Sequence, residues 1–127
     1  IWDFDNDGDL DIIVSHVDFK EKPALLRNDG GNENHWLGLT LTGKHGLTTG
    51  MGARITVVAD EHKQVFVNQW ATGYLSNSEP RVHIGLGQQK KINEIKIKWA
   101  DGQEEVFTNI EADQYLTIEK GKGILSK

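Results

Sequence analysis

The 127-residue sequence contains no cysteine, two prolines and one methionine. Disulfides are therefore excluded. The five histidines form no i,i+2 or i,i+4 pair, so the pattern does not predict a transition-metal site. No stretch approaches the roughly 18 consecutive apolar residues of a membrane-spanning helix. A basic excess is also lacking, because 14 Lys and Arg residues face 19 Asp and Glu residues. We therefore expect no membrane span in this chain and no nucleic-acid partner.

The acidic residues are concentrated at the opening of the chain. Five carboxylates occupy every second position of residues 3–11, around the single glycine Gly8. Two like charges about 4 Å apart repel by roughly 4 kcal/mol near a protein surface, and a hard divalent cation removes that penalty. The spacing predicts a Ca²⁺ loop. The expected ligands are the side chains of Asp3, Asp5, Asp7 and Asp11 and the main-chain oxygen of Asp9. The alternative is an acidic, solvated turn without metal.

The loop does not follow the EF-hand pattern. An EF-hand ends in Glu at its twelfth position and enters a helix, whereas the twelfth residue from Asp3 is Val14, in a β-branched run. A nine-residue loop that enters a strand resembles the FG-GAP/VCBS repeat, the blade unit of integrin-like β-propellers. Leu25–Gly31 is similar to the second strand and closing turn of that repeat. The resemblance implies bound Ca²⁺, and it implies upstream propeller repeats of the same chain as partners. We therefore expect the present sequence to be the C-terminal piece of a longer protein.

The rest of the sequence predicts short strands separated by turns, and no segment has a helical period. We expect an all-β fold, an antiparallel β-sandwich or barrel-like sandwich, over residues 32–127. A fragment of a propeller-type repeat would precede it over residues 1–31, with the boundary at the turn formers of 28–32. Residues 121–127 are expected to be a frayed tail. The predicted core includes Trp36, Leu39, Ile55, Val57, Phe66, Val82, Ile84, Ile95, Ile97, Trp99, Phe107 and Leu116.

A second resemblance covers most of the chain. Gly50–Val57, with the order G-M-G-A-R-I-T-V, is similar to a segment of the ASPIC/UnbV family. Thr72–Gly87 resembles the most characteristic block of that family, and Ile97–Gly102 resembles its W-P-D-G hairpin, with Ala100 replacing the usual proline. The family typically follows FG-GAP/VCBS repeats in secreted or envelope proteins. The resemblance therefore implies an extracellular or cell-envelope location, and it brings no catalytic residues.

Two long irregular segments, 43–52 and 70–80, are candidates for recognition, because compact domains seldom keep such loops without a use. We expect them to gather at one end of the sandwich and to bind a glycan or a protein. The candidate contacts are Trp70, Tyr74, Asn77 and Arg54. For Trp70 and Tyr74 themselves, the interpretation that we favour is that they simply plug the end of the sandwich, because large aromatic side chains usually go to cores.

The preferred function is a non-catalytic structural, adhesion or ligand-binding module at the end of a calcium-binding propeller. The alternative is a glycan-binding or glycan-hydrolysing domain, for which Glu79 with Asp113 or Glu111 would be the carboxylate pair. No pattern supports that pair, so we expect no enzyme activity. The lysines at 90, 91, 96 and 98 are interpreted as the solvated face of an edge strand.

Overall fold

The computed structural model describes residues 1–126 with the exception of 17, 19, 45–48 and 72. The regular structure of these residues is almost entirely β, with one 3-10 turn and no α-helix. The described part of the chain offers no helix with the length and apolarity needed to cross a bilayer. In chain order the elements are β1 (Ile12–Val14), β2 (Ala24–Leu26), η1 (Gly31–Glu33), β3 (His35–Thr42), β4 (Arg54–Ala59), β5 (His62–Val67), β6 (Val82–Gly87), β7 (Lys91–Lys98), β8 (Glu104–Glu111), β9 (Gln114–Glu119) and β10 (Gly123–Ser126).

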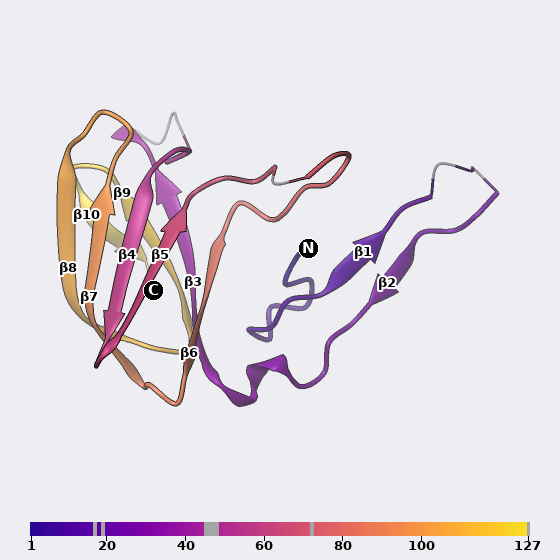
Figure 1. The fold of residues 1–127 in the computed structure, drawn as a ribbon, viewed down its shortest axis with the longest axis horizontal. Helices are drawn as coiled ribbons and strands as arrows, with labels where there is room; N and C mark the ends of the chain where they lie inside the picture. The colour runs from indigo at the N-terminus through magenta and orange to yellow at the C-terminus, as the bar shows by residue number, and fades with distance from the viewer. Residues whose placement is uncertain (17, 19, 45–48, 72, 127) are drawn as a thin grey trace.

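Two four-stranded sheets pack face to face and confirm the predicted β-sandwich (Figure 1). The first sheet has the strand order β10-β9-β3-β6, and the second has the order β5-β4-β7-β8. The hairpin signal at Asp101-Gly102 is confirmed as the connection from β7 to β8, where Gly102 adopts a φ of +87°. Tight turns of this kind set neighbouring strands antiparallel.

One strand pair departs from the antiparallel expectation. β3 and β9 run parallel, with Leu37 opposite Gln114 and Thr42 opposite Glu119. The segment between them contributes all four strands of the second sheet as well as β6, so no tight turn dictates their relative direction. Parallel neighbours require such a long connection.

The expectation of a frayed tail over residues 121–127 is wrong for Gly123–Ser126. These residues form β10, which pairs antiparallel with β9 and places Ile124 opposite Ile118. Gly121 and Gly123 take φ values of +77° and +86°, which let the chain reverse within a few residues.

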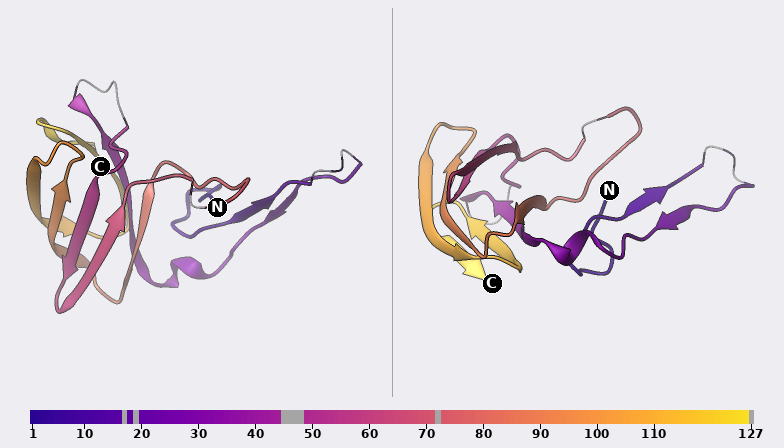
Figure 2. Two further views of the ribbon diagram at one scale, coloured as in Figure 1. Left: turned by 45° about the horizontal axis from the view of Figure 1, so that its top comes forward. Right: turned by 60° about the horizontal axis from the view of Figure 1, so that its bottom comes forward.

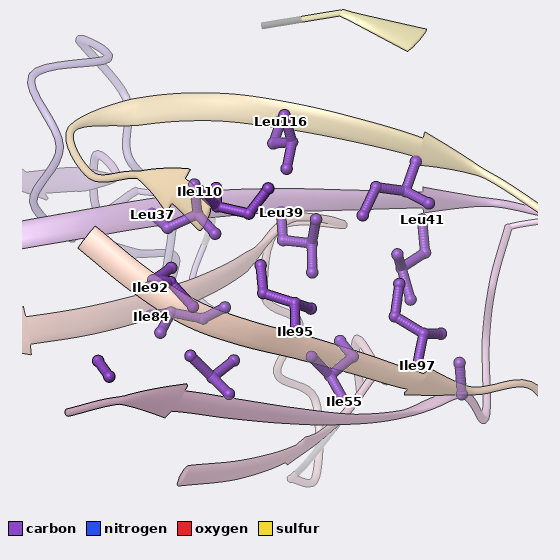
Figure 3. Packing of buried hydrophobic residues seen from close by; sticks show 14 of the residues in the cluster. Leu37, Leu39, Leu41, Ile55, Ile84, Ile92, Ile95, Ile97, Ile110 and Leu116 are labelled. Carbon is purple, nitrogen blue, oxygen red and sulfur yellow. The ribbon is translucent and has the colours of Figure 1, made fainter. Parts of the chain in front are cut away.

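Aliphatic side chains from both sheets fill the space between them (Figure 3). The predicted core is largely confirmed, because eight of its members are buried and three more pack against the core partly exposed. The buried eight are Leu39, Ile55, Val57, Ile84, Ile95, Ile97, Trp99 and Leu116, and the partly buried three are Phe66, Val82 and Phe107.

Trp36 is the one predicted core residue that lies elsewhere. The core face of β3 carries Leu37, Leu39 and Leu41, and side chains alternate between faces along a strand. Trp36 is therefore out of phase and lies half-buried on the outer face of the first sheet. Its partners there belong to the N-terminal segment and are described below.

The N-terminal hairpin of β1 and β2 projects away from the sandwich (Figures 1 and 2). Ile12 pairs with Leu26 and Val14 with Ala24. The apolar side chains of both strands are largely exposed, Ile13 by 50% and Leu26 by 56%. The division of the chain at residues 31 and 32 stays a prediction.

The alternation along β7 makes a direct stability test. Ile97 is 0% exposed, so Ile97→Ala is expected to lower the free energy of unfolding by about 2–5 kcal/mol, because it removes buried methyl groups and leaves a cavity. Lys98 is exposed on the opposite face, and Lys98→Ala is expected to change the same quantity by less than about 0.5 kcal/mol. Urea denaturation measures both, and equal losses would contradict the assigned register.

Candidate functional site

The acidic loop is closed at its base. The amide of Trp2 donates to the carbonyl of Asp11 at 3.1 Å, and the amide of Asp11 donates back at 2.9 Å. Carboxylate oxygens of Asp3, Asp5 and Asp11 lie within 4.8 Å of one another. Asp3 and Asp11 are buried, and Asp5 lies at the surface. The loop therefore brings together three of the five predicted ligands.

The side chains of the other two aspartates accept hydrogen bonds from backbone amides in this structure. Oδ1 of Asp7 accepts from the amide of Asp9 at 3.1 Å, and Oδ2 of Asp9 accepts from the amide of Gly31 at 3.0 Å. Their predicted role as metal ligands stays a prediction. The turn between them depends on Gly8, which has a φ of +98°.

Asp11 is fixed by two amides. Its Oδ1 accepts from Asn28 and its Oδ2 from Phe4, both at 2.9 Å. These two hydrogen bonds, with a smaller contribution from the charge of Arg27, hold the pKa of Asp11 below its usual range against the opposing effect of burial. Asp11 is therefore a carboxylate at neutral pH and can serve as a ligand oxygen.

The loop rests on the outer face of the first sheet. The Tyr115 hydroxyl donates to Oδ2 of Asp3. Arg81 donates to the Asp3 carbonyl at 3.2 Å and to the Asn6 side chain at 2.9 Å. Gly8 packs closely against Trp36, where an added Cβ would stand 2.0 Å from the indole ring. Contacts to a metal-binding loop from such neighbours orient its ligands.

The side chains under the loop form a packed polar layer, which we call the platform and define as Trp36, Arg81, His83 and Tyr115. The Arg81 guanidinium lies 4.3 Å from the centre of the Tyr115 ring, and Trp36 stacks on His83 at 5.9 Å. Glu79, which is 4% exposed, accepts two hydrogen bonds from Arg81 at 2.7 and 2.9 Å. The guanidinium is thus held in one orientation beneath the loop.

Burial sets the protonation of the platform. It raises the pKa of Tyr115, and the hydrogen bond to Asp3 raises it further, so the hydroxyl remains a donor. Burial also lowers the pKa of His83 despite the nearby charges of Asp3 and Glu79, which keeps the imidazole neutral at neutral pH. The platform therefore contributes a single positive charge, on Arg81.

Sequence reasoning missed the platform because its members come from three separated strands or strand ends. The register places His83 opposite Gly38 on one side, and Tyr115 opposite Gly38 on the other. An added Cβ at Gly38 would stand 2.4 Å from the Tyr115 ring. A glycine inside a strand often marks a close approach, so Gly38 in the segment 35–42 was the available signal.

The donor set fits a calcium ion. All grouped ligands are carboxylate oxygens, the kind that Ca²⁺ prefers. Oδ1 of Asp3 is buried and has no hydrogen-bond partner among the described residues. Buried polar atoms are rarely left in that state. The Arg27 side chain reaches the cluster at 3.7 Å from Asp5, and this pair is exposed.

The second predicted site is only partly assembled. Tyr74 is 93% exposed and Asn77 is also at the surface, so the prediction that Tyr74 plugs the sandwich is wrong. Trp70 is half-buried, with its indole nitrogen enclosed. Arg54 lies apart from them on the outer face of the second sheet, beside Thr56 and Lys98. The expectation that Arg54 joins the loop residues is wrong, because its position at the start of β4 turns it to that face.

Among the described residues, a backbone hydrogen bond joins the two long segments near their bases. The amide of Gly52 donates to the carbonyl of Asn68 at 2.9 Å. The β5–β6 connection then leads away from the sandwich toward the N-terminus (Figure 1), where the Glu79 amide donates to the Ile1 carbonyl at 3.0 Å. Residues 45–48 and 72 of these segments lie outside the described residues.

Fold and site together define a β-sandwich module that holds an acidic loop on its outer face. The ASPIC and UnbV family model matches residues 43–125, and the chain belongs to that family. Cartilage acidic protein 1 from Mus musculus and from Homo sapiens are each 30% identical over 105 residues, 81% of this chain and 16% of theirs. The Xenopus tropicalis protein of that name is 30% identical over 115 residues, 89% of this chain and 17% of its own. The chain thus spans about one sixth of the length of these relatives.

The contact between Gly8 and Trp36 can be tested by adding one methyl group. Gly8→Ala is expected to speed amide hydrogen exchange in residues 3–11 by about tenfold or more, because backbone strain and overlap with the indole push the loop off the platform. Gly30→Ala is the matched control, since its Cβ would meet nothing within 4 Å and its φ is −157°. Mass spectrometry measures the exchange, and similar protection in both variants would argue against the contact.

Proposed function

We propose that this chain is a non-catalytic module that binds Ca²⁺ through its acidic loop and ends a series of calcium-binding repeats. The observation that carries the proposal is the buried, unpartnered Oδ1 of Asp3 beside the carboxylates of Asp5 and Asp11. Three ionised carboxylates at such distances repel one another strongly unless a cation lies among them. The bound ion would supply that neutralising charge and link the two ends of the loop.

The residues of the sandwich have a defined part in this function. Tyr115 donates to one oxygen of Asp3 and leaves the other for the ion. Arg81 donates hydrogen bonds to the Asp3 carbonyl and to the Asn6 side chain, and these bonds fix the backbone of the turn. Because they do not use the carboxylate of Asp3, that group stays available to the metal. A loop preorganised in this way binds more tightly than a free peptide of the same sequence.

Preceding repeats are the partner that fits the N-terminal hairpin. An isolated two-stranded sheet is marginally stable in water, and here its apolar side chains are exposed, Ile12 by 46% and Leu25 by 45%. The resemblance of residues 1–31 to an FG-GAP/VCBS repeat and the greater length of the relatives support such neighbours. The word cartilage in the relatives' name supports extracellular placement, which we propose for this chain as well.

Recognition through the β5–β6 connection is a second candidate function. Tyr74 and Leu75 stand at its tip, 93% and 83% exposed, and Leu75 has a φ of +50° that is uncommon for such a residue. Adjacent exposed aromatic and aliphatic side chains favour adhesion to an apolar partner surface. Glycan hydrolysis is less favoured, because Glu79, Asp113 and Glu111 are each engaged by a basic side chain.

Calcium binding is tested by isothermal titration calorimetry. The chain is expected to bind one Ca²⁺ with a Kd of about 0.1–1 mM, the range of extracellular modules. Asp5→Asn is expected to weaken binding at least about tenfold, because it removes a charged ligand. Asp60→Asn, a substitution in the β4–β5 turn, is the matched control and should bind as the wild type does. Absence of heat at millimolar Ca²⁺, or equal affinity of the two variants, would refute the site.

The recognition surface is tested on a glycan array and on immobilised extracellular-matrix proteins. Tyr74→Ala is expected to lose at least about tenfold in affinity for whichever ligand the wild type retains, as a fully exposed aromatic anchor would. Leu125→Ala, which also truncates an exposed side chain but on β10 of the first sheet, should keep that affinity. Equal binding by wild type and Tyr74→Ala would exclude the tip as the recognition surface.

A further inference from the structure

The outer face of the second sheet carries a shallow hollow of about 290 Å³. It lies over the two central strands, β4 and β7, with β5 and β8 at its margins. Its lining is strongly charged and mainly positive, with the cations Arg54, Lys63, Lys96 and Lys98 and the carboxylates Glu94 and Glu104. We call this surface the cationic face.

The sheet register places like charges together on the cationic face. Arg54 stands directly opposite Lys98 on the neighbouring strand. Lys96 lies two residues before Lys98, on the same face of β7. Like charges directly opposite one another on neighbouring strands destabilise a sheet. The placement of Arg54 opposite Lys98 is therefore expected to lower the stability of the second sheet.

The nearby carboxylates do not neutralise these cations. Glu104 forms an ion pair with Lys96 at 2.8 Å, and this hydrogen bond, aided by the charge of Lys98, holds the pKa of Glu104 below its usual range. Glu94 also lines the hollow, so two carboxylates face the four cations Arg54, Lys63, Lys96 and Lys98. The side chains of Arg54 and Lys63 take part in no ion pair or hydrogen bond among the described residues.

Protection of a sheet edge does not explain these lysines. Edge strands use lysine to prevent pairing with other chains, and the sequence favoured that interpretation for positions 96 and 98. The structure shows it to be wrong, because β7 is paired on both sides, with β4 and with β8. A positive face on a chain of net charge −5 instead indicates attraction of an anionic partner.

We propose that the cationic face binds an anionic polysaccharide. Because β4 and β7 are paired on both sides, they offer no free backbone groups to a peptide strand. Exposed valines at the margins, Val65, Val67 and Val106, can pack against the apolar C–H groups of sugar rings while the cations contact sulfate or carboxylate groups. The described residues of this face include no aromatic side chain, which disfavours neutral sugars, since these bind mainly by ring stacking.

The test is calorimetry of the whole chain with a sulfated hexasaccharide, a neutral hexasaccharide and a polyglutamate peptide of equal charge. The sulfated sugar is expected to bind, and added salt should weaken its binding. The triple variant Arg54→Gln, Lys63→Gln and Lys98→Gln is expected to lose at least about tenfold in affinity. The matched control Lys20→Gln, Lys22→Gln and Lys90→Gln removes the same charge elsewhere and should lose less than about twofold.

Each other outcome overturns the proposal. Equal losses in both triple variants would mean that only net charge attracts the sugar, and tighter binding of polyglutamate would point to a protein partner. Absence of binding by the sulfated sugar would exclude the site. Thermal unfolding of the triple variant, expected at or above the temperature of the wild type because the opposed like charges are removed, separates lost binding from lost folding. Asp5→Asn should bind the sulfated sugar as the wild type does, so this proposal and the calcium proposal fail independently.

Discussion

The hydrogen bond from the Tyr115 hydroxyl to the Asp3 carboxylate joins parts of the chain that are 112 residues apart in sequence. It fixes the acidic loop to the outer face of the sandwich, and Arg81 and Trp36 complete the attachment. Gly38 makes the arrangement possible, because a side chain there would displace the Tyr115 ring. The loop and the sandwich therefore form one structural unit where they meet, although the sequence resembles a repeat in one part and a separate domain in the other.

The sequence predicted what local rules control. The alternation along β7 identified Ile95 and Ile97 as core residues, and Asp101-Gly102 identified a hairpin. Strand alternation also determines the face on which Trp36 lies, but its size and apolarity favoured the core until its phase relative to Leu37 and Leu39 was known. The parallel pairing of β3 with β9 has no local signal, because strands so far apart can meet in either direction.

The residues of the candidate sites also fall into those that local sequence rules identify and those that only the sheet register brings together. The ligand spacing of the acidic loop is contained in nine consecutive residues, so Asp3, Asp5 and Asp11 were found from sequence. The platform residues Arg81, His83 and Tyr115 come together only through sheet register, and sequence alone does not supply register for distant strands. The same limit applies to Arg54, which register places beside Lys98 and not beside the loop residues.

The parallel pairing of β3 with β9 also has a consequence for how the molecule folds. In the order of synthesis, β3 first obtains β6 as a neighbour, and it gains its second neighbour only after all of β4 through β8 has been made. Contacts between such distant segments carry a large loop-closure entropy and slow the folding of β proteins. The first sheet therefore completes late, and until then the core face of Leu37, Leu39 and Leu41 is only partly covered. A nascent chain that pauses before residue 114 would leave part of this apolar surface uncovered, and exposed surface of this kind makes incompletely folded proteins prone to aggregation.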